Sequence, residues 1–134
     1  MSQSLESPSI ECYISLVAEA FGYSLPTQQA AERLFPKYWR KHFDPERAGL
    51  WKEILTNAQQ SQLLIKAVQS SLINFSPRQK QFLEARFGLK DGQFMTQADT
   101  IKAGIVGTSE VSLLERLALN NFGNRRGLFR QFLP

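Results

Sequence analysis

A series of helix start and stop signals in the second half of the chain restricts the folds that this sequence can adopt. Ser76-Pro77 predicts a helix start, because serine is a good N-cap and proline is tolerated at the first helical position. Gly88 and the turn sequence Lys90-Asp91-Gly92 should end that helix. Two short helices are then predicted, the first beginning after Thr96, with a turn from Gly104 to Gly107 between them. A helix followed by two helices around a tight bend is typical of a helix-turn-helix.

Residues in this series also match the pattern of a known family. One part of the match is Ser76-Pro77-Arg78-Gln79, continuing through Ala85-Arg86-Phe87-Gly88-Leu89 to Asp91-Gly92. In the other part, Thr96 opens the first helix of the motif, and the family's apolar and acidic positions correspond to Val111, Leu114, Glu115 and Leu119. On these residues, the stretch from about 61 to 122 resembles region four of bacterial sigma factors, which docks on the minus-35 promoter element. The resemblance implies an all-α fold, a helix-turn-helix and binding to double-stranded DNA.

Positive charge is unevenly distributed along the 134 residues, whose formal net charge is +4. Residues 1–60 carry six Lys/Arg against seven Asp/Glu, whereas residues 61–134 carry ten against five. Between Arg116 and Pro134 there are four arginines and no acid. Such asymmetry favours contact between the second half and nucleic acid, with a solvated basic tail as the alternative.

The first half is also predicted to be helical. After a loose lead over residues 1–8, Ser9 should cap a helix from Ile10 to about Phe21 that has one apolar face and is ended by Gly22. Leu25-Pro26-Thr27 should start a second helix, which Pro36 must break or kink. Asp44-Pro45-Glu46 is a third start signal. Its helix could run to about Ile73, and the alternative is a break at the Gln-rich residues 59–62, which interrupt its apolar stripe.

A basic and aromatic segment, Lys37-Tyr38-Trp39-Arg40-Lys41-His42-Phe43, separates the second and third start signals. Cations interleaved with aromatic rings can grip phosphates and stack on bases. The alternative is that the rings belong to the core while the cations stay in water, and this alternative is favoured because aromatic side chains mostly supply buried area.

Several other functions are disfavoured by the sequence. It has no phosphate-cradling glycine loop and no nucleophile–base pair, so we do not expect an enzyme or a cofactor. The only histidine, His42, has no cysteine or second histidine nearby, which disfavours a metal site. Cys12 is the only cysteine, the polar start does not resemble a signal peptide, and no apolar run has the length of a membrane span. A cytoplasmic location is therefore expected.

The last helix of the series is the candidate DNA-reading surface. Thr108 or Ser109 is expected to cap it. At about 100° per residue, one side is apolar and should face the core: Val111, Leu114, Ala118 and Phe122. The opposite side, which we assign to DNA, carries Ser109, Ser112, Leu113, Arg116 and Asn120. Arg116 and Asn120 can read guanine and adenine edges, Leu113 can touch a thymine methyl group, and Arg125 and Arg126 of the tail are predicted to add contacts.

A second interpretation keeps the fold and changes the ligand. The sigma family places several arginines and a glutamine at the front of this helix, where this chain has Glu110 and Leu113 among small polar residues. The module would then bind protein, such as RNA polymerase, a sigma factor or a second copy of the chain. The predicted anchors for such a partner are Leu113, Leu117, Phe129 and Phe132. A third interpretation is a purely structural motif.

Three segments are therefore expected. Residues 1–60 form an N-terminal helical extension, residues 61–122 form the sigma-like helix-turn-helix, and residues 123–134 form a basic and aromatic tail. Leucine and phenylalanine beside arginine in the tail suggest either docking on a partner or folding back over the core, because disordered tails are poor in aromatic residues.

Overall fold

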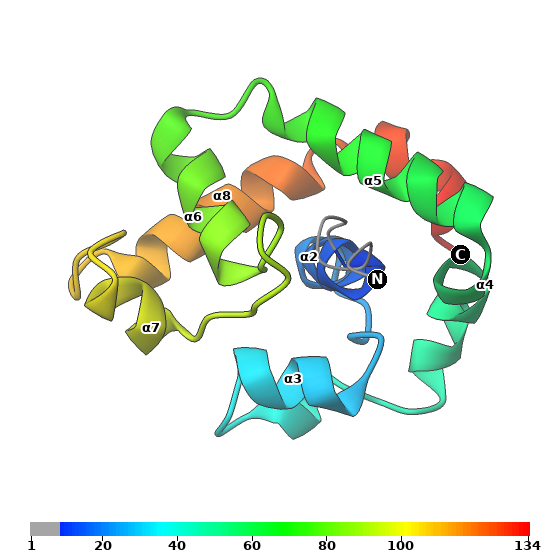
Figure 1. Ribbon diagram of the computed structural model, residues 1–134, viewed down its shortest axis with the longest axis horizontal. Helices are drawn as coiled ribbons and strands as arrows, with labels where there is room; N and C mark the ends of the chain where they lie inside the picture. The colour runs from blue at the N-terminus through cyan, green and yellow to red at the C-terminus, as the bar shows by residue number, and fades with distance from the viewer. Residues whose placement is uncertain (1–8) are drawn as a thin grey trace, which may run out of the picture.

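One helix lies at the centre of the fold, and the others surround it. The computed structural model describes residues 9–134, and every regular element in that range is a helix, which confirms the all-α prediction. The prediction for residues 1–8 lies outside the described range. In Figure 1 the view runs nearly down the axis of the central helix α2 (Ile10–Phe21), with the remaining helices arranged around it.

The central helix begins and ends where its sequence predicts. The Ser9 hydroxyl accepts a hydrogen bond from the backbone N–H of Glu11, and Gly22 ends the helix with φ 79°. Burial extends beyond the apolar face that the sequence indicates, because all seven residues from Cys12 to Ala18 are buried. Burial raises the pKa of the Cys12 thiol to about 12. The helix is surrounded because α3, α5 and α8 pack against it from different sides.

The second helix, α3 (Gln28–Leu34), is capped by Thr27 and ends before Pro36, as predicted. After it the chain makes a short 3-10 turn, η1 (Trp39–Lys41). The proline explains the stop, because its ring excludes the preceding helical turn and it has no N–H to donate.

The long helix predicted from Asp44 to Ile73 is divided in the structure. It comprises a 3-10 helix η2 (Arg47–Trp51), a short helix α4 (Lys52–Thr56) and α5 (Ala58–Leu72). The break falls at Asn57, just before the Gln-rich residues. The Asn57 side chain accepts hydrogen bonds from the N–H groups of Gln59 and Gln60, so it starts a new helix in a new direction.

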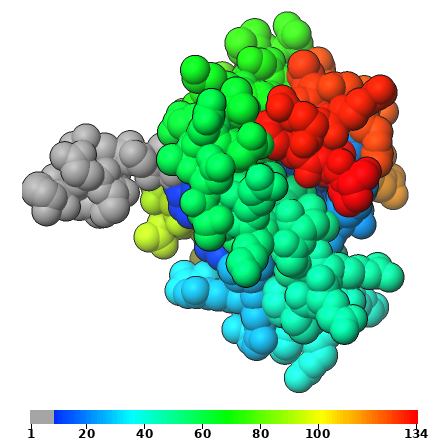
Figure 2. Space-filling model, turned by 90° about the vertical axis from the view of Figure 1, so that its right-hand side faces the viewer, coloured from blue at the N-terminus to red at the C-terminus, as the bar shows by residue number. Residues whose placement is uncertain are grey.

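The second half contains three further α-helices and a terminal 3-10 helix. They are α6 (Pro77–Arg86), α7 (Gln97–Lys102), α8 (Val111–Gly123) and η3 (Arg126–Phe132). Ser76 caps α6 as predicted. The tail folds back: η3 packs against α5, and Figure 2 shows the red C-terminal segment beside it.

A single apolar core joins all three predicted segments. It includes Trp51 from the first, Phe82 and Phe122 from the second, and Phe129 from the tail, each fully buried. The predicted boundary between residues 60 and 61 falls inside α5. No helix among the described residues is long and apolar enough to cross a membrane.

Candidate nucleic-acid interface

Arg86 is a buried arginine that connects α8 to three other parts of the fold. Its side chain is 1% exposed, and its Nε donates to Oε1 of Glu115 on α8 over 2.6 Å. Its Nη1 donates to the backbone oxygens of Leu34 and Met95, at 3.0 and 2.6 Å. Arg86 therefore links α6, α8, the end of α3 and the loop before α7. Both Arg86 and Glu115 belong to the residues that carry the sigma-like resemblance.

The turn after α6 requires glycine at position 88. Gly88 has φ +66°, and a Cβ atom there would lie 2.6 Å from the backbone oxygen of Gln93. The turn brings the Met95 N–H within 3.0 Å of the Arg86 oxygen. The backbone thereby reverses its direction and leads to the start of α7.

The helix α7 begins with a capping box. The Thr96 hydroxyl accepts from the Asp99 N–H, and the Asp99 carboxylate accepts from the Thr96 N–H. The hydrogen bond that the Thr96 N–H donates to the carboxylate is the main cause that lowers the pKa of Asp99. Between α7 and α8 lie residues 103–110, whereas helix-turn-helix motifs typically use a turn of about three to four residues. The connection between α7 and α8 is therefore longer than a typical helix-turn-helix turn.

The two faces of α8 are as predicted. The residues that face the core, all buried, are Val111, Leu114, Ala118 and Phe122. The predicted DNA-reading side chains are all exposed: Ser112, Leu113, Arg116 and Asn120 lie on α8, and Ser109 lies in the turn before it. The face is held in register because the Asn121 amide donates to the Gln79 side chain of α6 over 3.1 Å.

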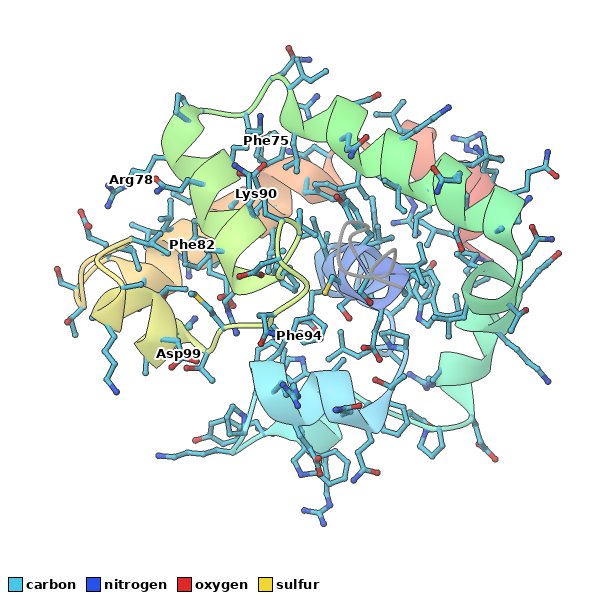
Figure 3. All side chains as sticks on the ribbon, in the orientation of Figure 1. Phe75, Arg78, Phe82, Lys90, Phe94 and Asp99 are labelled. Atoms are coloured by element: carbon cyan, nitrogen blue, oxygen red, sulfur yellow. The ribbon has the colours of Figure 1, made fainter. Side chains whose placement is uncertain are left out.

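The front of α8 differs from the expected cap. The helix begins at Val111, and no side chain caps it, so the predicted cap at Thr108 or Ser109 was wrong. Instead, Glu110 pairs with Arg78 of α6, with 2.5 Å between Oε1 and Nη2. Arg78 lies on the outer side of α6 (Figure 3). Arg78 and Glu110 are 32 residues apart in the sequence, so no local pattern predicts that they pair. The positive charge of Arg78 offsets the negative charge of Glu110 at the front of the helix.

The tail arginines lie just beyond the end of α8 and contact aromatic rings. The Arg125 guanidinium is half-buried and sits 5.1 Å from the centre of the Phe75 ring. Arg126 is exposed, lies 5.5 Å from the Phe21 ring centre and contacts the Tyr23 hydroxyl at 3.3 Å. Both are thus separate from the row of polar side chains along α8.

The predicted partner anchors divide into two groups. Phe129 and Phe132 are 0% and 7% exposed and belong to the chain's own core, so the tail follows the fold-back alternative and their assignment as surface anchors was wrong. Leu113 and Leu117 are 50% and 47% exposed. Only these two remain available to a partner.

Comparisons with protein-family models, curated proteins and solved structures find no match to this chain. Within residues 9–134, no three histidine, cysteine or acidic side chains are grouped so that they could hold a metal ion.

Proposed function

We propose that this chain is a transcription-associated regulator that binds double-stranded DNA through α7 and α8, used as a helix-turn-helix. The observation that carries the proposal is a row of exposed polar side chains on α8. Ser112, Arg116 and Asn120 follow one another at four-residue spacing, so they form one line along the helix. Arginine and asparagine are suited to bidentate hydrogen bonds with guanine and adenine in the major groove.

The electrostatics around α8 support this function. Arg78 offsets the charge of Glu110, so the front of the helix does not present an unpaired carboxylate to phosphate. Arg116 is exposed and no carboxylate of residues 9–134 lies within salt-bridge distance of it. The resemblance to region four of sigma factors supports the same function.

The prediction that tests this proposal concerns Arg116→Ala. If Arg116 reads a base, the substitution should weaken binding by about 1–3 kcal/mol, roughly 5- to 150-fold, and relax the preference for one duplex over another. The measurement is fluorescence anisotropy with labelled promoter-like and mixed-sequence duplexes, from low to physiological salt.

A matched control is Lys52→Ala, which removes an exposed cation from α4 on the other side of the fold from α7 (Figure 1). It should leave sequence preference unchanged. Flat anisotropy curves for the wild-type chain at low salt, or equal effects of Arg116→Ala and Lys52→Ala, would refute DNA reading by α8.

A second candidate function is protein binding, which the two half-exposed leucines of α8 favour. Leu113 and Leu117 are four residues apart and form an apolar strip beside the polar row. The predicted partners are RNA polymerase or a sigma factor.

If this strip is an anchor, Leu113→Ser with Leu117→Ser should weaken capture of the chain by purified RNA polymerase by about 2 kcal/mol, roughly 30-fold. Leu63→Ser on α5, a leucine of comparable exposure, should have no such effect. Polymerase capture that is unchanged by the double substitution would exclude the strip as the anchor.

A further inference from the structure

A concentration of unpaired positive charge lies in the first half of the chain. The eleven residues from Arg33 to Phe43 contain no acid and four Lys/Arg, namely Arg33, Lys37, Arg40 and Lys41. All four side chains are exposed. Within residues 9–134, none of them has a carboxylate within salt-bridge distance.

Part of the positive charge in the second half is paired within the fold. Arg78, Arg86 and Lys90 lie within salt-bridge distance of carboxylates. The charge count along the sequence therefore points to the second half, whereas a dense group of unpaired cations lies in the first.

Aromatic rings hold two of these cations in place. The Arg40 guanidinium lies 4.6 Å from the Trp39 ring centre, and the Lys41 ammonium lies 5.2 Å from the Tyr38 ring centre. Trp39 is half-buried and anchors the segment, while Tyr38 is 59% exposed. Cations restrained in this way lose less side-chain entropy on binding than free ones do.

The segment adjoins the helix pair proposed to bind DNA. A hollow of about 470 Å³ is lined on one side by Leu34 to Tyr38 and on the other by Thr96 to Ala98, at the start of α7. In helix-turn-helix complexes the first helix crosses the DNA backbone while the second enters the major groove. Phosphates that pass α7 would therefore approach Lys37, and Arg40 and Lys41 follow it in the adjoining turn η1.

We propose that Lys37, Arg40 and Lys41 form a second phosphate-binding surface, which contacts the backbone of the duplex that α8 reads. This inference rests on the proposed function. The surface supplies affinity without sequence information, because phosphate contacts position a protein on DNA and base contacts specify the site.

The test compares the salt dependence of duplex binding for the full chain and for the variant Lys37→Gln with Lys41→Gln. Each phosphate contact contributes about 0.9 to the slope of log affinity against log salt, so the variant's slope should be smaller by about 2. Its preference between promoter-like and mixed-sequence duplexes should stay at the wild-type ratio. The matched control, Lys52→Gln with Lys66→Gln, removes the same charge from exposed positions on α4 and α5 and should keep the wild-type slope.

The outcomes separate this inference from the proposed function. Wild-type binding with equal slopes for both double variants overturns the second surface and leaves DNA reading by α8 intact. A loss of sequence preference in the Lys37/Lys41 variant overturns the role as a phosphate contact. Absence of duplex binding by the wild-type chain overturns both proposals. Far-UV circular dichroism checks that each variant is folded.

Discussion

Replacing Arg86 by methionine should lower the free energy of unfolding by about 3–5 kcal/mol. The substitution leaves the Glu115 carboxylate, 12% exposed, without its cation, and it leaves the backbone oxygens of Leu34 and Met95 without their donor. A buried charge or acceptor without a partner loses its hydration and gains nothing in return. Urea unfolding followed by circular dichroism measures the change.

The chain provides a matched control on the same pair of helices. Arg78 also reaches from α6 to a glutamate at the front of α8, but both side chains of that pair are more than half exposed. Arg78→Met should therefore cost less than about 1 kcal/mol. Adding Glu115→Gln to Arg86→Met should recover part of the lost stability, because it removes the unpaired charge. Equal losses for Arg86→Met and Arg78→Met would contradict the role assigned to Arg86.

Replacing Phe129 by alanine should cost about 3–5 kcal/mol of stability, although the residue lies only five positions before Pro134. Its ring is fully buried and lies 5.1 Å from the ring of Phe122 on α8 and 5.4 Å from that of Phe21 on α2, between ring centres. Removing it leaves a cavity where three segments meet. For a chain of this size the melting temperature should fall by roughly 10–20 °C.

The neighbouring residue is the control for this prediction. Leu128 is 47% exposed, so Leu128→Ala should lower stability by less than about 1 kcal/mol. If both variants melt at nearly the wild-type temperature, the tail does not contribute to the core. A large loss for Phe129→Ala alone means that the tail packs on the core of its own chain. Equal, small losses mean that Phe129 is free to bind a partner protein instead.

Both substitutions remove contacts to α8. Arg86 pairs with Glu115 of α8, and Phe129 packs against Phe122 near the C-terminal end of α8. A destabilised variant of either kind would also weaken the binding that we propose for α8. Binding measurements on such variants should therefore be made well below their melting temperatures, after circular dichroism has shown native helix content.

Many helix ends can be predicted from the sequence alone. Ser9 and Ser76 cap helices as predicted, Thr27 caps the helix that was predicted to start at Leu25-Pro26-Thr27, and Gly22 ends the first helix with the left-handed backbone that glycine favours. The sequence also determined which face of α8 is buried, because helical periodicity places residues 111, 114, 118 and 122 on one side. These signals act within one or two turns of chain, so they can be recognised locally.

Contacts between residues that are distant in the sequence could be known only from the tertiary structure. Seven consecutive residues of α2 are buried because helices pack around it, and Phe129 is buried because the tail returns to α5 and α8. Folding also pairs Arg86 with Glu115, although the two residues are 29 positions apart. Among residues 9–134, folding leaves Lys37 and Lys41 with no carboxylate within salt-bridge distance. Charge totals count cations without showing which are neutralised, because an ion pair depends on distance in space and not on separation along the chain.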